Sequence, residues 1–298
     1  GEGYEGHYFW DTEIFIQPFF ALTDPDRARE LLRYRYGILD AARENARRLG
    51  HQKGAAYPWR TISGSECSTF FPAGAAQYHI NADIAYALVH YYFATGDETL
   101  LLGEGAEILF ETARLWMELG HFQEETFRIN TVTGPDEYTA MVDNNYYTNI
   151  MARHNLKWAV KVYLMLTERG DHELIEGIGL TSREVEGFEK AYQNMYLPYD
   201  EELGITPQDD SFLSKKQWDI AGTPDEHFPL LLHYHPMMLY RHQVCKQADA
   251  LLAYYLFPGD HAREMLARSY EYSTGLVSRV KRRNNTCSLH AYRQDGYR

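Results

Sequence analysis

The sequence has 298 residues, a formal net charge of −13 at pH 7 and 45% hydrophobic residues. This length suits one large domain or two small ones, and the apolar content is sufficient for a globular core. The acidic balance argues against nucleic-acid binding, which requires a basic surface. No apolar run approaches the ~20 residues of a membrane span, so we expect no membrane association.

Three cysteines, Cys67, Cys245 and Cys287, occur without a CxxC spacing. An odd number of cysteines without paired spacing argues against a disulfide framework and favours a reducing compartment. We therefore expect a cytoplasmic protein.

Helical patterns follow one another along the chain. Asp24 and Pro25 form an N-cap with proline at the first helical position, and apolar residues then recur at helical spacing up to Gly50. Thr181 and Glu184 have the spacing of a capping box. About eight helices are predicted, near 11–22, 25–50, 82–94, 97–120, 147–167, after 181, at 241–256 and at 261–273. No strand pattern has comparable strength, so the predicted fold class is all-α.

Three long connections separate these helices, at 51–78, 121–144 and 196–235. Long loops in compact domains are often functional. Paired helices with alternating short and long loops predict an α/α toroid whose long loops gather on one face.

The most informative run is Val132–Tyr138, which places the adjacent carboxylates Asp136 and Glu137 just after a Gly-Pro turn. Proline restricts its own φ and the residue before it, so a carboxylate that follows is held in a defined direction. Defined geometry is the first requirement of a general acid. Tyr138 and the amides of Asn144–Asn145 could bind a polyhydroxylated ligand. The alternative is a solvated, Asp-rich loop that caps the next helix.

Three other places carry chemistry. Trp10 and Asp11 put an indole beside a carboxylate, which suits sugar binding, although an N-cap aspartate with a core tryptophan is an alternative. Trp59 and Arg60 lie in the first long loop, where a proline turn with a packed indole is the alternative. Lys246–Gln247 is predicted to lie on a helix, where such a pair is commonplace.

Other reaction classes lack their signatures. The histidines His227, His233 and His235 are close in sequence, but no HExxH or Cys/His ligand set appears, so a metal site is not predicted. The sequence has no GxSxG elbow, no Walker motif and no dinucleotide fingerprint.

Six segments together resemble family 65 of the glycoside hydrolases, which includes maltose, kojibiose, nigerose and trehalose phosphorylases. The resemblance runs from residue 1 to about 273. The loop at 57–62 looks most like the kojibiose type. The segments that carry the match, in the order of the family, are Gly6–Glu13, Ala56–Trp59, His79–Tyr86, Thr112–Trp116, Gly134–Tyr138 and Lys246–Asp249.

The resemblance implies a fold and a set of site residues. The family's catalytic domain is an (α/α)6 barrel of twelve helices, of which about eight would lie in residues 1–273, as an incomplete barrel. By resemblance, Glu137 is the general acid. The subsite for the transferred glucosyl unit would contain four residues, with two more close to it; these are Trp10, Asp11, Lys246 and Gln247, then Trp59 and Arg60.

The implied reaction is inverting phosphorolysis of an α-linked glucose disaccharide, which gives β-glucose 1-phosphate and glucose. Inorganic phosphate would be the co-substrate, and no metal or organic cofactor is expected. The full-length protein would be a homodimer. Two alternatives remain open: an inverting α-glucoside hydrolase of the same family, and a non-catalytic sugar-binding fragment. Dependence on phosphate separates the two enzymes.

Two departures from the family pattern stand out. Ser65 occupies a position where relatives usually carry Glu before Glu66. Residues 274–298 form an aberrant basic tail where the family has a Glu-Pro-Leu-Thr segment and a His-Asp-Ser-Ser phosphate loop. We expect the 298-residue chain to be a piece of a longer protein and a poor enzyme by itself.

Overall fold

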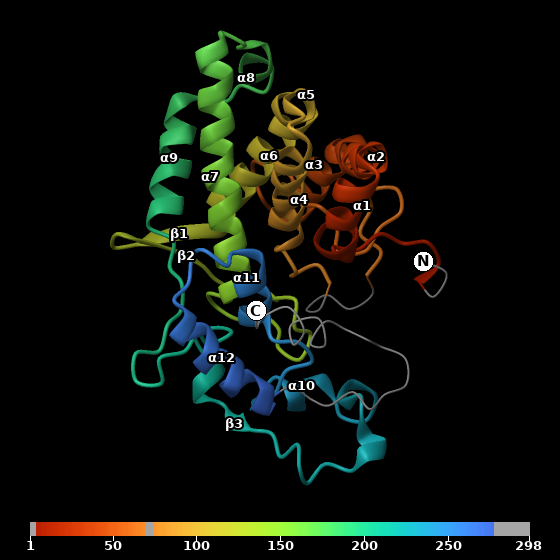
Figure 1. Cartoon of the computed structure of the whole chain (residues 1–298), viewed down its shortest axis with the longest axis vertical. Coiled ribbons are helices and arrows are strands. Elements are labelled where there is room, and N and C mark those ends of the chain that lie inside the picture. Colours follow the sequence, from red (N-terminus) through yellow and green to blue (C-terminus); the bar gives the residue numbers. More distant parts are fainter. Residues whose placement is uncertain (1–3, 69–73, 277–298) are drawn as a thin grey trace.

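The computed structural model describes residues 4–68 and 74–276, and the fold is mostly helical, as the sequence predicted. Figure 1 shows two parts: helices α1–α9 fill the upper part, and a smaller lobe with α10, α12 and β3 lies below, with α11 between them. Most of the basic tail predicted at 274–298 lies outside the described residues.

The chain begins with a π-helical turn, Thr12–Ile16, which continues into α1 (Gln17–Thr23). Asp24 caps the next helix as predicted, because its side chain accepts a hydrogen bond from the backbone N–H of Arg27 at 3.4 Å. The single helix predicted for 25–50 is wrong, since the chain forms α2 (Pro25–Gly37) and α3 (Leu39–Arg48). Ile38 leaves helical geometry at φ −107° and ψ 11°, and this change of direction separates the two helices.

Helix α4 (Ile80–Thr95) lies at the centre of the upper part and contacts α1, α2, α6 and α7. The helix predicted near 97–120 is also divided, into α5 (Glu98–Leu102) and α6 (Glu104–Leu119). The break falls at Gly103, whose φ of −100° and ψ of −109° suit a residue without a side chain.

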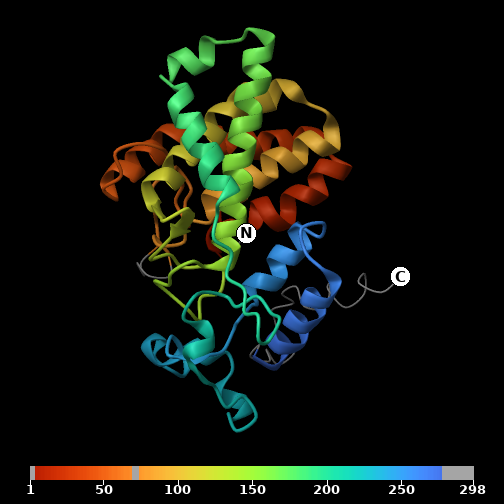
Figure 2. The ribbon, with the colours of Figure 1, turned by 90° about the vertical axis from the view of Figure 1, so that its left-hand side faces the viewer.

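Two long helices close the left side of the upper part, α7 (Tyr146–Arg169) and α9 (Ser182–Gln193), with the short α8 (Glu173–Gly177) between them. Figures 1 and 2 show α7 and α9 side by side, and the two helices pack against each other. The capping box predicted at the start of α9 is confirmed: Thr181 and Glu184 exchange side-chain to backbone hydrogen bonds.

Strands are present, although the sequence showed no clear strand pattern. Strands β1 (Gly120–Gln123) and β2 (Thr126–Ile129) form an antiparallel hairpin in the second long loop. Strands β3 (Lys216–Gln217) and β4 (His242–Gln243) form a parallel pair. Segments of two to four residues are too short for an alternating pattern to be visible in the sequence.

Within the smaller lobe, residues 211–244 form three 3₁₀ turns, the short helix α10 and the strands β3 and β4, and we call this segment the C-terminal lobe. Its small core contains Tyr138, Leu230, Leu239 and Val244. The elements of the lobe that are not strands are Phe212–Ser214, Asp225–His227, Leu230–Leu232 and α10 (Pro236–Leu239).

The last two helices are α11 (Asp249–Leu256) and α12 (Arg263–Leu276). The helix predicted at 241–256 is therefore wrong in its first eight positions, and Lys246 and Gln247 precede the helix. Their backbone N–H groups donate to the Asp136 side chain, at 2.9 Å and 3.4 Å, and not to carbonyl groups of a helical turn. No helix in the described part of the chain is both long enough and apolar enough to cross a membrane.

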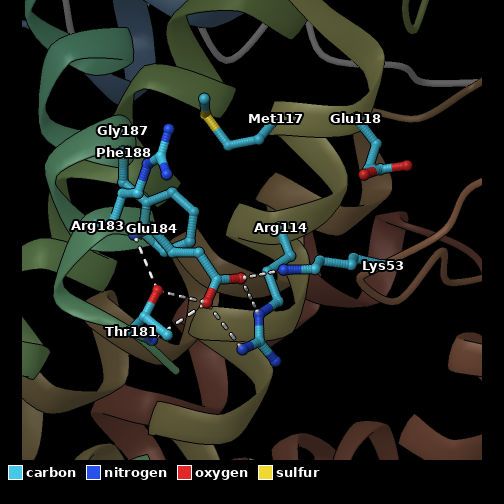
Figure 3. Close-up of a pocket in the computed structure, with 9 residues that line it drawn as sticks. All are labelled: Lys53, Arg114, Met117, Glu118, Thr181, Arg183, Glu184, Gly187 and Phe188. Atoms are coloured by element: carbon cyan, nitrogen blue, oxygen red, sulfur yellow. Dashed lines mark hydrogen bonds and ion pairs between the residues drawn. The ribbon is translucent and has the colours of Figure 1, made fainter. Parts of the chain in front are cut away.

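An ion-pair network ties α6 to the start of α9 and to the first long loop. In Figure 3, dashed lines join the Glu184 carboxylate to both Arg114 and Lys53, and the three residues line a cavity of about 410 Å³. Oε1 of Glu184 accepts from Arg114 Nε and from Lys53 Nζ, each at 3.0 Å. Burial would raise the pKa of Glu184, but hydrogen bonds from Arg114 and Lys53 lower it to about 2. The residues that line the cavity include none of the predicted site residues.

Glu184→Gln should destabilise the fold, because Arg114 and Lys53 lose their carboxylate partner. We expect the free energy of unfolding to fall by about 1–2 kcal/mol at pH 7, since charge-assisted hydrogen bonds at a partly exposed site are replaced by weaker ones. A carboxylate with a lowered pKa stabilises the fold above its usual pKa of 4.5, and this contribution is lost as the pH falls towards 2. Urea unfolding of the parent and the variant at several pH values measures both effects.

The matched control is Glu186→Gln, which makes the same charge change at an exposed position of α9. The control should leave the unfolding free energy nearly unchanged. A difference between the parent and Glu184→Gln that stays constant from pH 7 to pH 3 would contradict the proposed role of the ion pair.

Candidate active site

The turn that carries Glu137 is fixed by its surroundings. Val132 and Val142 each donate a backbone N–H to the carbonyl oxygen of the other. The backbone N–H of Thr133 donates to the carbonyl oxygen of Ala76 at 2.9 Å. A Cβ on Gly134 would lie 2.3 Å from Oδ2 of Asp249 and 2.4 Å from Nδ2 of Asn145. Only glycine can occupy this position without displacing its neighbours, so the turn packs directly against buried polar groups.

The two adjacent carboxylates of this turn point in different directions. Asp136 is completely buried, whereas the side chain of Glu137 is 22% exposed. The alternative of a solvated, Asp-rich loop is therefore wrong for Asp136. Asn145, which also belongs to this region, caps α7 by accepting a hydrogen bond from the backbone N–H of Thr148 at 2.9 Å.

The segment that contains Lys246 and Gln247 meets this turn, although more than 100 residues separate the two in the sequence. Lys246 Nζ donates to Oε2 of Glu137 at 2.6 Å. Gln247 Nε2 donates to the carbonyl oxygen of Pro135, also at 2.6 Å. Burial would lower the pKa of Lys246, but the adjacent Glu137 carboxylate raises it. The structure therefore brings three of the predicted site residues into one contact network.

Asp11 lies within electrostatic reach of Glu137 and Lys246. Asp11 is exposed to solvent. Burial raises the pKa of Asp11, and the charges of Glu137 and Lys246 act on it in opposite directions. The arrangement thus puts two carboxylates and one ammonium group around a region that solvent can reach.

Trp10 supports Asp11 from the interior. Its ring is 6% exposed and meets the edge of His79 at a centroid distance of 5.1 Å. His79 and Tyr147 are in turn fixed by Asp83, which accepts from His79 Nδ1 at 2.7 Å and from the Tyr147 hydroxyl at 2.8 Å. The indole therefore packs on a fully buried hydrogen-bonded network.

A buried ion pair fixes the π-helical turn that follows Trp10 and Asp11. Glu13 is 2% exposed and Arg35 is 0% exposed. Arg35 donates from Nε to Oε1 of Glu13 at 2.7 Å and from Nη2 to Oε2 at 2.9 Å. The same Nη2 also lies 3.4 Å from the carbonyl oxygen of Phe9. This bidentate pair joins α2 to the segment that presents Asp11.

Trp59 and Arg60 lie next to Phe9 and not against Glu137. The Trp59 ring packs edge-on against Phe9 at 5.1 Å, and the Arg60 guanidinium lies 5.9 Å from the same ring. Glu66 holds their loop, because its carboxylate accepts from the backbone N–H of Trp59 at 2.7 Å and of Arg60 at 3.2 Å. The structure thus places both residues near the Trp10 segment, without a described contact to the Glu137–Lys246 pair.

Sequence reasoning missed Tyr240, which follows α10 in the C-terminal lobe. Burial raises the pKa of its phenol, and the negative charge of Glu137 raises it further. An electrostatic effect of this kind requires the two groups to be close. The lobe is attached to the turn by Tyr138, whose hydroxyl accepts from the backbone N–H of Leu230 at 3.1 Å. No local sequence pattern around residue 240 indicated that Tyr240 lies close to Glu137.

The three histidines that lie close together in the sequence have partners other than a metal ion. The rings of His227 and His233 stack at 5.2 Å, and His227 Nδ1 is 2.7 Å from the Tyr234 hydroxyl. His235 caps α10, because its Nδ1 accepts from the backbone N–H of Met237 at 3.2 Å. Within residues 4–68 and 74–276, no group of three or more His, Cys, Asp or Glu side chains is arranged to hold a metal ion.

Arg35→Met should destabilise the protein strongly, because it leaves the Glu13 carboxylate buried without its partner. We expect the free energy of unfolding to fall by about 3–5 kcal/mol, the usual cost of breaking a buried ion pair. Chemical denaturation measures this change. The double variant Glu13→Leu/Arg35→Met should recover a large part of the loss, because it removes both charges.

Arg33→Met is the matched control, since Arg33 lies on the same helix and its ion pairs with Glu30 and Glu104 are exposed. It should change the unfolding free energy very little. Equal destabilisation by the Arg33 and Arg35 variants would mean that the buried pair has no special role.

Comparison with known proteins gives consistent matches. A family model described as the glycosyl hydrolase family 65 central catalytic domain matches residues 1–281. An α,α-trehalose phosphorylase of Geobacillus stearothermophilus is 57% identical over 275 residues, which are 91% of this chain and 36% of the relative. A kojibiose phosphorylase of Halothermothrix orenii is 38% identical over an alignment of 291 residues that covers 91% of this chain and 37% of the relative.

A solved structure described as "Putative kojibiose phosphorylase from human microbiome" has the same fold. It superimposes with a TM-score of 0.85 and 27% identity, over 93% of this chain and 37% of that chain. The chain therefore spans about a third of the length of the curated relatives that it matches.

Proposed function

Because the chain belongs to glycosyl hydrolase family 65, we propose that it contributes the acid-bearing part of an inverting disaccharide phosphorylase. We further propose that its helices belong to an (α/α)6 barrel. The mostly helical fold and the phosphorylase names of the relatives support both proposals. The activity is proposed for the complete gene product that contains these residues.

The observation that carries this proposal is the contact between Glu137 and Lys246. The Glu137 carboxylate, on a rigid turn, accepts a hydrogen bond from Lys246 Nζ at 2.6 Å. The charges of both groups influence the pKa of Asp11. A polyhydroxylated substrate is bound by carboxylates, which accept hydrogen bonds from its hydroxyl groups, and by cations, which donate hydrogen bonds to its oxygens. Glu137 is the exposed carboxylate of its turn, as a residue that reacts with a bound sugar must be.

In the proposed reaction, Glu137 donates a proton to the glycosidic oxygen of an α-linked glucose disaccharide. The bond between the anomeric carbon and that oxygen breaks, and an oxygen of inorganic phosphate bonds to the anomeric carbon from the opposite face. The products are β-glucose 1-phosphate and glucose. An inverting hydrolase needs a second carboxylate to activate water, whereas phosphate is already a nucleophile. The proposal requires no metal or organic cofactor.

The other predicted residues have supporting roles in this proposal. Asp11 accepts hydrogen bonds from hydroxyl groups of the transferred glucosyl unit, and Lys246 and Gln247 donate to its oxygens. Trp10 holds Asp11 from the interior. Trp59 and Arg60, which lie beyond Phe9, border the same subsite.

We propose α,α-trehalose as the first substrate to assay. The trehalose phosphorylase match has higher identity than the kojibiose phosphorylase match, over the same share of this chain. Kojibiose is the second substrate, because kojibiose phosphorylases also match along most of the chain.

Glu137→Gln in the complete gene product should abolish most turnover while leaving sugar binding measurable. The amide keeps the shape of the side chain but cannot donate the proton, so kcat should fall by at least the ~10²–10⁴-fold that general acid catalysis contributes. Glucose release from trehalose in phosphate buffer measures kcat. Glu173→Gln, at an exposed position of α8, is the control and should retain parental activity. Parental turnover in Glu137→Gln would remove this residue from the mechanism.

Activity should also depend on inorganic phosphate. With phosphate, each cleaved trehalose should give one glucose and one β-glucose 1-phosphate, which NMR distinguishes from the α-anomer by its anomeric coupling. Without phosphate, cleavage should stop. Release of two glucose molecules for each trehalose in phosphate-free buffer would identify a hydrolase instead.

A further inference from the structure

The strongest polar cluster outside the reacting groups lies directly behind Glu137. Asp136 Oδ1 accepts from the backbone N–H of Lys246 at 2.9 Å, and more weakly from those of Gln247 and Tyr138 at 3.4 Å. Its other oxygen, Oδ2, accepts from Gln208 Nε2 at 3.0 Å. One buried side chain therefore receives donors from three separate parts of the chain.

Gln208 orients this carboxylate. Its amide nitrogen donates to Asp136, while its amide oxygen accepts from the backbone N–H of Asp249 at 2.6 Å. The backbone oxygen of Gln208 accepts from Asn145 Nδ2 at 3.1 Å, and the same nitrogen lies 3.1 Å from Oδ2 of Asp249. Because the two ends of the Gln208 amide have opposite partners, the amide cannot rotate by 180° without losing both bonds.

The two buried aspartates of this cluster, Asp136 and Asp249, differ in their hydrogen-bond partners. Asp136 has four donors, whereas Oδ1 of Asp249 is buried without a hydrogen-bond partner. Burial raises the pKa of Asp136 to about 6, against the hydrogen bonds from Lys246 and Gln208. Burial and the charge of Asp136 raise the pKa of Asp249 well above its usual range.

The segment between β4 and α11 depends on these bonds. Residues 244–248 belong to no helix or strand, so their backbone N–H groups need other partners. Asp136 supplies the acceptor for two of them, and its carboxylate also hydrogen-bonds the side chain of Cys245. Gln247 Nε2 donates to the carbonyl oxygen of Pro135, and Val244 packs in the same small core as Tyr138. Among these contacts, only Asp136 binds the backbone of Lys246 itself, and it is the residue adjacent to Glu137.

We propose that Asp136, oriented by Gln208, is a positioning residue that sets the distance between Glu137 and the Lys246–Gln247 segment. The proposal rests on the proposed function for its effect on turnover. Its geometric part, the bond between Asp136 and two backbone N–H groups, is independent of any activity.

A reciprocal exchange of functional groups tests the pairing. In Asp136→Asn, the new Nδ2 faces Nε2 of Gln208, so two donors meet. In Gln208→Glu, two carboxylates meet. In the double variant Asp136→Asn/Gln208→Glu, the asparagine Nδ2 donates to one glutamate oxygen and the other oxygen still accepts from Asp249 N–H. The asparagine Oδ1 also still accepts from Lys246 and Gln247, so the double variant keeps the number of bonds and the net charge.

The expected result is a loss in each single variant and recovery in the double variant. Each single variant of the complete gene product should lower kcat by about 10–100-fold, since a displacement of about 1 Å in a site costs up to ~10²-fold. The double variant should return to within about fivefold of the parent. Hydrogen exchange of the backbone N–H groups of Lys246 and Gln247 should accelerate in the single variants and slow again in the double variant.

Asp209→Asn is the matched control. Asp209 is buried beside Gln208, but its Oδ1 accepts from Ser211 at 2.9 Å (N) and 2.6 Å (Oγ), and not from the 246–247 segment. Its variant should reduce stability without lowering kcat or changing exchange at Lys246 and Gln247. If Asp136→Asn does not fold, Gln208→Leu removes the bridge without opposing two donors, and it should lower kcat and accelerate exchange at both amides.

Two results would overturn the inference. One is a double variant that is no more active than the single variants, with exchange that stays fast at Lys246 and Gln247. The other is that the single variants Asp136→Asn and Gln208→Glu change stability and KM only and keep the parental kcat. Failure of the proposed function has a different signature, because Glu137→Gln would then retain turnover whatever exchange at Lys246 and Gln247 shows.

Discussion

The structure depends on one constraint: the long loops that carry the candidate site have backbone N–H groups that no helix or strand satisfies. Buried or half-buried side chains supply the acceptors. Asp136 receives the N–H groups of the 246–247 segment, and Glu66 receives those of Trp59 and Arg60. Unpaired backbone groups away from water are costly, so each such acceptor fixes its loop in one conformation. The candidate site is therefore held in place by side chains whose carboxylates bind backbone N–H groups.

The same principle applies to charge. The interior under Trp10 and Asp11 contains the Glu13–Arg35 pair, and both groups are almost completely buried. A buried pair contributes little net stability when compared with apolar residues of similar volume, but the loss of one partner is severe. Its role is then mainly geometric, because the bidentate contact allows one relative position of α2 and the turn that presents Asp11. Rigid support of this kind is what the proposed general acid and the proposed sugar subsite require.

Periodicity predicted the helices well, because apolar residues at helical spacing face one contiguous core. It failed where single residues override the pattern, as at Ile38 and Gly103, and where an element is only two to four residues long. It also extended a helix over Lys246 and Gln247, since nothing in the local sequence shows that a distant aspartate binds their N–H groups. The meeting of the turn at 134–138 with this segment followed only from family resemblance. Gln208 gave no signal at all, because a lone glutamine in a loop has no pattern.

The two neighbouring carboxylates of the turn show how one short motif can serve two purposes. Asp136 enters the interior and is completely buried, whereas the side chain of Glu137, at the next position, is 22% exposed. The Asp136 carboxylate accepts from the backbone N–H of Lys246. The Glu137 carboxylate accepts from Nζ of the same lysine. Lys246 is thereby bound at both ends by adjacent residues. The contact between Glu137 and Lys246 is consequently a property of the backbone geometry, and it does not depend on the rotamer of a flexible lysine alone.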